Sequence, residues 1–125
     1  MITNVKVLKA LMEVQYHPKM VDLAVWVAVR INHPRITSAY RSKKVHSKDS
    51  GIHMTNPCRA VDWESKNLDD PRIVCDDINN HWIYDPKRPE MRCAIYHDVG
   101  LGLHIHTQVH PRTVFHPNGR GEIKP

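Results

Sequence analysis

The sequence predicts an α+β fold, in which helices pack on one side of a small, mostly antiparallel sheet. Two observations carry this prediction. Residues 5–14 and 19–31 repeat apolar positions at helical spacing, which is typical of helices that bury a face. Residues 91–96 and 103–109 have strand character and flank a tight turn at residues 99–102, which predicts an antiparallel hairpin.

The first two predicted helices are separated by a local break. Residues 5–14 form the first amphipathic segment, and His17-Pro18 ends it. Pro18 is well placed in the first turn of the next helix, because its fixed backbone angle suits that position and its missing N–H is not needed there. Residues 19–31 are apolar nearly all round, so this second helix is expected to be the buried core helix.

Two short strands are predicted on either side of a long polar loop. Residues 36–40 and 59–63 have strand character, whereas residues 41–58 are polar and show no periodicity. A loop of about eighteen residues is longer than compact domains usually contain without a functional reason. This loop is therefore expected to have a functional role.

A third helix is predicted after residue 70. Asp70 is a favourable N-cap and Pro71 fits the first helical turn. The positions expected to be buried are Ile73, Val74, Ile78 and Trp82. The predicted hairpin of residues 91–109 follows it.

Length and composition indicate one domain that covers residues 1–125. Its polar tail, after about residue 111, is expected to be loosely ordered. No run approaches the roughly 20 apolar residues of a membrane span, and no secretory signal is visible, so a cytoplasmic protein is expected. The three cysteines form no even framework and no C-x-x-C pair, which favours free buried thiols. The net charge of +5 favours a polyanionic partner, either nucleic acid or an anionic cell wall.

The run of residues 103–109 carries the strongest chemical signal. Its period-two alternation places His104 and His106 on one face of a strand. With His53 and Asp62 from elsewhere in the chain, the set offers three imidazoles and one carboxylate. Three such ligands and an open fourth position match a catalytic zinc site. His97, His110 and His116 are expected to face solvent.

The order of these residues resembles a known family. The motifs concerned are, in order, Ser38-Ala39-Tyr40-Arg41, His53, Ala60-Val61-Asp62 and the His-x-His strand. This ordered set resembles the motifs of the zinc D-Ala-D-Ala carboxypeptidase and L-Ala-D-Glu endopeptidase family. That family is related to lysostaphin-type peptidases and to the Hedgehog signalling domain, and its small phage-encoded members are the most similar. The resemblance covers residues 36–109 and implies a Hedgehog/DD-peptidase-like fold.

The resemblance implies roles for individual residues. It implies that His53, Asp62 and His106 bind zinc and that His104 lies beside the scissile bond as the catalytic base. It also implies that Arg41 faces the substrate, where it could bind a substrate carboxylate or stabilise the oxyanion. Ser38 and Tyr40, from the same segment, are expected to contribute to substrate binding.

The chain departs from the family pattern at two places. The Asp follows the first His by nine residues instead of seven, so His46 is an alternative to His53 as the first ligand. The acidic residue that many members place three residues before the last His is missing. Asp98, at the start of the hairpin turn, is therefore an alternative to His104 as the general base.

The favoured function is a zinc peptidase that hydrolyses peptidoglycan stem peptides or related peptides containing D-amino acids. A phage protein made in the host cytoplasm and acting on the cell wall, like an endolysin, fits this interpretation. One alternative is a metal-dependent phosphoesterase or nuclease, but a single Asp is few for an oxygen-rich magnesium site, so nucleic acid is not the favoured partner. Another is a non-catalytic zinc-containing binding module, because the usual acidic base is missing. The oligomeric state stays open.

Overall fold

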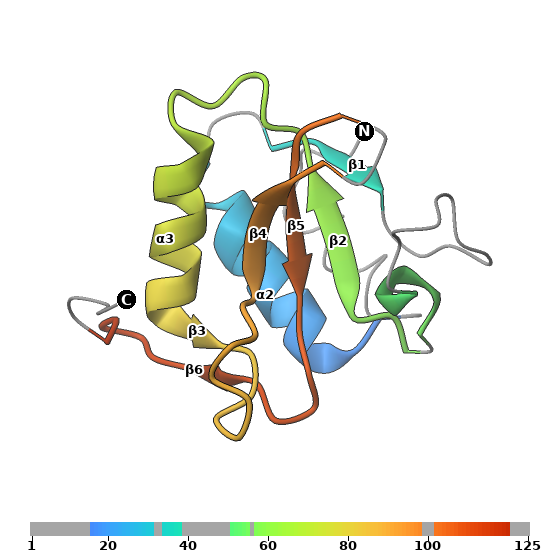
Figure 1. The fold of residues 1–125 in the computed structure, drawn as a ribbon, viewed down its shortest axis with the longest axis vertical. Coiled ribbons are helices and arrows are strands. Elements are labelled where there is room, and N and C mark those ends of the chain that lie inside the picture. The colour runs from blue at the N-terminus through green and yellow to red at the C-terminus, as the bar shows by residue number, and fades with distance from the viewer. Residues whose placement is uncertain (1–15, 32–33, 39–50, 56, 99–101, 121–125) are drawn as a thin grey trace.

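The central element of the fold is a four-stranded sheet. The computed structural model describes residues 16–31, 34–38, 51–55, 57–98 and 102–120 (Figure 1). The strands are β1 (Ile36–Ser38), β2 (Ala60–Trp63), β4 (Ala94–His97) and β5 (His104–Gln108). They lie in the order β1-β2-β5-β4, and each neighbouring pair is antiparallel. The predicted α+β class and its mostly antiparallel sheet are confirmed, and the helix predicted at residues 5–14 lies outside the described residues.

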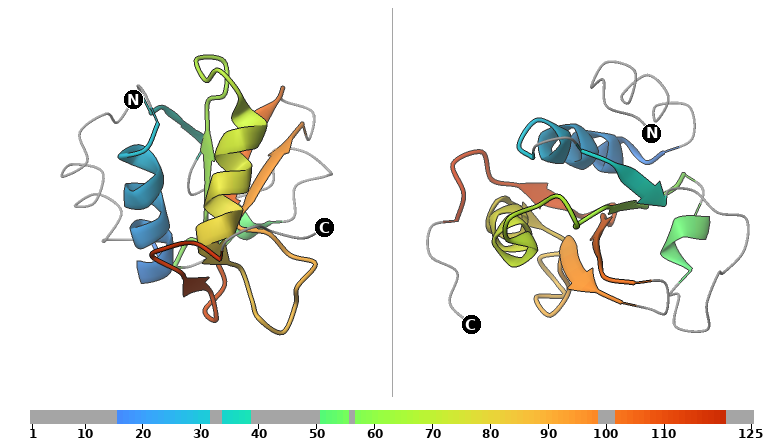
Figure 2. Two further views of the ribbon diagram at one scale, coloured as in Figure 1. Left: turned by 90° about the vertical axis from the view of Figure 1, so that its left-hand side faces the viewer. Right: turned by 90° about the horizontal axis from the view of Figure 1, so that it is seen from above.

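One face of this sheet is covered by the helices α2 (Pro18–Ala28) and α3 (Pro71–His81) (Figure 2). Val61, Trp63 and Ile105 project from this face and are at most 1% exposed. The short 3-10 helix η1 (Ile52–Met54) lies on the other side of the sheet (Figure 2). The sheet therefore has an apolar face towards the helices and a second face that is free to carry polar groups.

α2 begins where the sequence predicts. Pro18 occupies the first turn, and Nδ1 of His17 accepts a hydrogen bond from the backbone N–H of Lys19 at 3.1 Å. The helix ends at Ala28, three residues earlier than predicted. Its core side chains include Met20 and Leu23, which are fully buried, so its prediction as a core helix is confirmed.

α3 also begins as predicted, and of its predicted core positions Ile78 is buried and Val74 is half-buried. The Asp70 carboxylate accepts hydrogen bonds from the backbone N–H groups at the start of the helix. Ile73, predicted to be buried, is 64% exposed, whereas Asn79 is buried. The Asn79 amide exchanges two hydrogen bonds with the backbone of Ala94, at 2.9 and 3.0 Å. The prediction is therefore wrong for Ile73, and apolar spacing could not reveal that the polar Asn79 attaches the buried face of the helix to β4.

A second, two-stranded sheet joins the end of α3 to the C-terminal segment. β3 (Trp82–Ile83) pairs with β6 (Val114–Phe115), so Trp82 is buried as predicted but lies in a strand. The Arg112 guanidinium binds the Asp85 carboxylate through two contacts, at 3.0 and 2.6 Å. The prediction of a loosely ordered tail is therefore wrong for residues 111–120, because backbone pairing and a charged pair attach them to the domain.

Two expectations from composition can be compared with the described residues. Cys58, Cys75 and Cys93 are buried and form no disulfide, as predicted. Neither α2 nor α3, the α-helices of the described part of the chain, has the length and apolar character that crossing a bilayer requires.

Candidate metal centre

The sheet face opposite the helices carries the polar residues singled out by the sequence. Asp62 on β2 is the direct antiparallel partner of His106 on β5, so their side chains project from the same face. His104 lies two residues before His106 and projects from that face too, as the alternation predicts. Strand pairing thus brings together residues that are more than forty positions apart in the sequence.

His53 reaches the same place from η1. Ile52 anchors η1 in the core, and Gly51 enters it with a φ of 87°, a backbone conformation that glycine adopts without strain. The Thr55 hydroxyl closes the turn by donating to the carbonyl of Ile52 at 2.8 Å. The Cys58 thiol contacts the carbonyl oxygen of His53 at 3.4 Å. Part of the long polar loop is therefore an ordered turn that carries His53.

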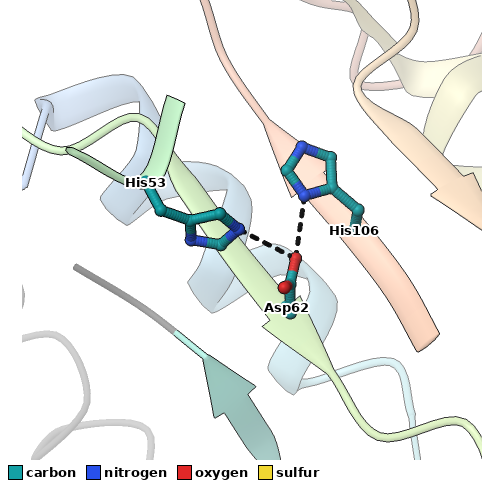
Figure 3. Close-up of side chains that lie close together, drawn as sticks. All are labelled: His53, Asp62 and His106. Carbon is teal, nitrogen blue, oxygen red and sulfur yellow. Dashed lines mark hydrogen bonds and ion pairs between the residues drawn. The ribbon is translucent and has the colours of Figure 1, made fainter. Parts of the chain in front are cut away.

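His53, Asp62 and His106 form a compact, buried group (Figure 3). Oδ1 of Asp62 lies 3.1 Å from Nε2 of His53 and 2.8 Å from Nδ1 of His106. The three residues are between 2% and 6% exposed, and one ligand atom from each lies within 4.8 Å of the others. The predicted convergence of these three side chains is confirmed.

The charge on Asp62 is held in place by its neighbours. Burial raises the pKa of a carboxyl group, but hydrogen bonds from His106 and His53 outweigh it and hold the pKa of Asp62 well below its usual range. Asp62 is therefore a carboxylate at neutral pH. A buried negative charge beside two imidazoles favours a cation at this point.

The donor set fits a transition-metal ion. Two imidazole nitrogens and one carboxylate oxygen are a common protein ligand set for zinc, and they leave a fourth position open. No cysteine belongs to this group, and burial raises the pKa of Cys75 and Cys93 to about 12, which keeps both thiols protonated. The group can therefore hold a metal ion through nitrogen and oxygen donors.

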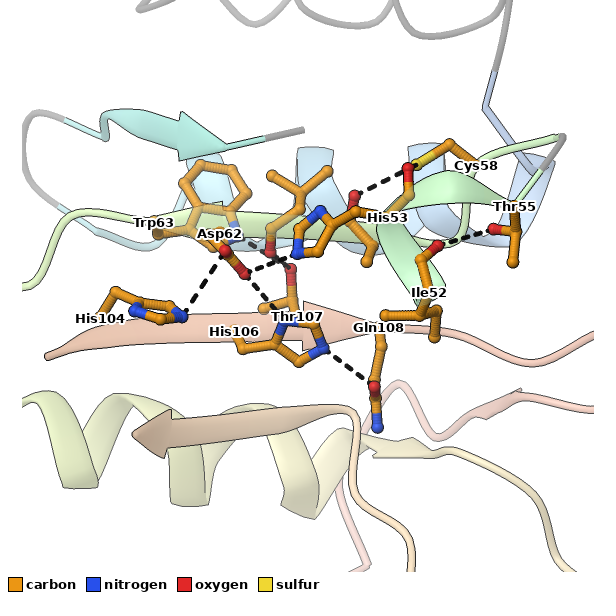
Figure 4. Close-up of polar contacts among 12 residues, drawn as sticks. Ile52, His53, Thr55, Cys58, Asp62, Trp63, His104, His106, Thr107 and Gln108 are labelled. Carbon is orange, nitrogen blue, oxygen red and sulfur yellow. Dashed lines mark hydrogen bonds and ion pairs between the residues drawn. The ribbon is translucent and has the colours of Figure 1, made fainter. Parts of the chain in front are cut away.

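His104 and Asp98 occupy different positions relative to the group. Nε2 of His104 lies 3.5 Å from Oδ2 of Asp62 (Figure 4). Nδ1 of the same ring lies 3.0 Å from the carbonyl oxygen of Gly102. Asp98 is exposed, and its carboxylate accepts the Gly102 N–H at 2.9 Å. His104 therefore contacts the buried group directly through Asp62.

The remaining predicted site residues belong to the segment around β1. The backbone of Ser38 pairs with that of Asp62 between β1 and β2. Tyr40, Arg41 and His46 lie outside the described residues, and their assignments stay predictions.

Two residues of the site were missed by the sequence interpretation. His97 is paired with His104 across the hairpin, and its ring centroid lies 4.9 Å from that of His104 and 5.4 Å from that of His106. The expectation that His97 simply faces solvent is therefore wrong. Burial and the nearby His106 and His104 rings lower the pKa of His97, so it is neutral at pH 7. Counting the hairpin register outward from the turn would have identified it.

Gln108 is the other missed residue. It follows His106 by two positions on β5, so the same alternation that paired the histidines also places Gln108 on their face. Its Oε1 lies 2.9 Å from Nε2 of His106 (Figure 4). The signal for Gln108 was therefore present in the sequence.

Comparisons with models of protein families, with curated proteins and with solved structures found no match for this chain. The resemblance to the zinc peptidase family stays a prediction, based on the order of His53, Asp62, His104 and His106 in the sequence.

Proposed function

We propose that this protein is a zinc-dependent peptidase that hydrolyses peptidoglycan stem peptides or related peptides containing D-amino acids. The observation that carries this proposal is the buried group of His53, Asp62 and His106, with His104 next to it. It supplies the ligands of a catalytic zinc site together with a separate imidazole that is not needed as a ligand.

The choice of zinc follows from the donor atoms. Magnesium prefers an octahedral shell of oxygen ligands and usually binds through carboxylates, whereas imidazole nitrogens suit zinc and its transition-metal neighbours. Asp62 is the one carboxylate in the group of three potential ligands found among the described residues. This composition argues against the alternative of a magnesium-dependent nuclease.

When bound, zinc supplies a nucleophilic water near neutral pH and a Lewis acid for the scissile carbonyl. His104 is placed to move the proton. The carbonyl oxygen of Gly102 can only accept, so Nδ1 of His104 carries the ring proton and Nε2 keeps its lone pair towards the site. Nε2 can then accept a proton from the attacking water and return it to the leaving amine.

The substrate class rests on the resemblance of residues 36–109 to the peptidase family. In this proposal Arg41 binds a carboxylate of the stem peptide, because a planar guanidinium can form two parallel hydrogen bonds to it. The same resemblance assigns Ser38 and Tyr40 to substrate binding. The net charge of +5 would favour approach to an anionic cell wall.

The test uses protein purified without a histidine tag, loaded with zinc and incubated with purified peptidoglycan. We expect released peptides with new termini, detected by mass spectrometry, and no release after chelation of the metal. His104→Ala should retain zinc but lose the activity, whereas Asp76→Asn, an exposed change on α3, should alter neither. Zinc binding without cleavage of any peptide would instead indicate a binding module. Cleavage of a phosphodiester with manganese or magnesium would indicate the nuclease alternative.

A further inference from the structure

His106 is contacted at both of its ring nitrogens by different partners. Nδ1 faces Oδ1 of Asp62 at 2.8 Å, and Nε2 faces Oε1 of Gln108 at 2.9 Å. We infer that Gln108 is a positioning residue of the metal centre, because it holds His106 in the tautomer that presents Nδ1 to the metal. The inference rests on the metal centre of the proposed function, but not on the reaction that the centre performs.

The orientation of the Gln108 amide is set by a second contact. Its Nε2 donates to the backbone carbonyl of Arg92 at 2.8 Å. A backbone carbonyl can only accept, so the NH₂ group of Gln108 must face Arg92 and the amide oxygen must face His106. The backbone carbonyl of Arg92 therefore determines the direction of the whole chain of hydrogen bonds.

The tautomer of His106 follows from this direction. The Gln108 oxygen accepts, so Nε2 of His106 must donate its N–H. A metal-bound imidazole is neutral and has one ring N–H, so with Nε2 donating to Gln108 it is Nδ1, beside the Asp62 carboxylate, that offers its lone pair to the ion. The arrangement thus prepares His106 to bind a metal through Nδ1.

Burial makes this arrangement effective. Gln108 is 5% exposed and His106 is 6% exposed, so water does not compete strongly for either hydrogen bond. Metal-binding histidines commonly donate the other ring N–H to a fixed acceptor, and removal of such an acceptor costs about 10- to 100-fold in metal affinity. Here a side-chain amide takes this part, itself held by the main chain of the segment leading into β4.

The test compares zinc affinities by competition with a chromophoric chelator. Gln108→Leu keeps a similar side-chain length but removes the acceptor, and we expect zinc to bind roughly 10- to 100-fold more weakly. Gln108→Glu keeps an oxygen acceptor for His106 but loses the donor to the Arg92 carbonyl, so its affinity should lie between those of wild type and Gln108→Leu. Equal zinc affinity in wild type and Gln108→Leu would overturn the inference.

Thr107→Val is the matched control. Thr107 is the neighbouring residue on β5, but it points to the opposite face, where its hydroxyl binds Trp63 and the Val61 carbonyl. We expect this variant to lose thermal stability and to keep its zinc affinity. A drop in zinc affinity as large as that of Gln108→Leu would show that any loss of a β5 hydrogen bond weakens the site, which would also overturn the inference.

A direct reading of the tautomer completes the test, and it does not depend on the stability of any Gln108 variant. Long-range nitrogen–proton NMR correlations of the wild-type protein with one equivalent of zinc should show the His106 proton on Nε2. A proton on Nδ1 would overturn the inference while leaving zinc binding intact. Wild-type protein that binds no zinc would overturn both the inference and the proposed function, whereas zinc binding with the expected tautomer but no peptide hydrolysis would overturn the proposed function alone.

Discussion

Asp62→Asn is the substitution that tests the candidate metal centre most directly. Oδ1 of Asp62 lies within 3.1 Å of both His53 and His106, and the residue is 6% exposed. Asparagine keeps the size of the side chain but removes its negative charge. We therefore expect the variant to fold but to lose most of the stabilisation that zinc confers on the wild type.

The size of this effect follows from linkage between binding and folding. Free zinc at about 100 times its dissociation constant should stabilise the folded wild type by about 2.7 kcal/mol. For a chain of 125 residues, about 1 kcal/mol changes Tm by roughly 3–5 °C, so zinc should raise the wild-type Tm by roughly 8–14 °C. Loss of a ligand charge should weaken zinc binding by at least about 100-fold, which exceeds the effect of residues that only orient ligands. The same zinc concentration would then stabilise Asp62→Asn by about 0.4 kcal/mol and raise its Tm by only about 1–2 °C.

The assay is thermal unfolding followed by far-ultraviolet circular dichroism, in EDTA and in buffered zinc. Asp76→Asn on α3 makes the same chemical change at an exposed position and should respond to zinc like the wild type. The three cysteines must be kept reduced without a chelating thiol, because zinc binding to the unfolded chain would diminish the shift. A zinc-induced rise in Tm of equal size in Asp62→Asn and wild type would refute Asp62 as a ligand. No rise in the wild type would refute the metal centre itself.

Three further predictions concern the base, the substrate and a charged pair outside the site. His104→Ala should keep zinc and lose roughly two to four orders of magnitude in peptide hydrolysis, whereas Asp98→Ala should retain its rate; the opposite pattern would make the carboxylate the base. Arg41→Lys should reduce turnover, because an ammonium group cannot reproduce the planar fork of a guanidinium; wild-type turnover would make Arg41 a surface residue. The Arg112 hydrogen bond holds the pKa of Asp85 well below its usual range, so this pair should stabilise the fold above about pH 4 and lose its effect as the pH falls further. The difference in Tm between wild type and Arg112→Leu should therefore shrink between pH 5 and pH 2, and a constant difference would contradict this assignment.

Much of the local structure was predictable from the sequence, because it depends on neighbours along the chain. Pro18 marks the start of α2, and Asp70 with Pro71 marks the start of α3. The alternation in residues 103–109 predicted that His104 and His106 share a strand face, since successive side chains of a strand point to opposite sides. Leu103 shows the limit of this rule, because alternation places it on the same face as the buried Ile105, yet it is 57% exposed.

The tertiary structure decided what periodicity cannot encode. The face that α3 buries depends on the hydrogen bonds between Asn79 and Ala94, and the order of residues 111–120 depends on pairing with β3 and on Asp85. Each of these contacts joins segments far apart in sequence. No local pattern predicts such contacts, because their free energy is gained only after the chain has brought both partners together.

The candidate site shows the same division between local and long-range information. The sequence by itself determined which residue types were available and that His104 and His106 share a face. Only the folded chain decided that His53 arrives on η1, that Asp62 lies opposite His106, and that Gln108 contacts the far side of the His106 ring. The physical reason is that side-chain direction along a strand is a property of the backbone, whereas ligand convergence depends on strand register and on the path of a loop.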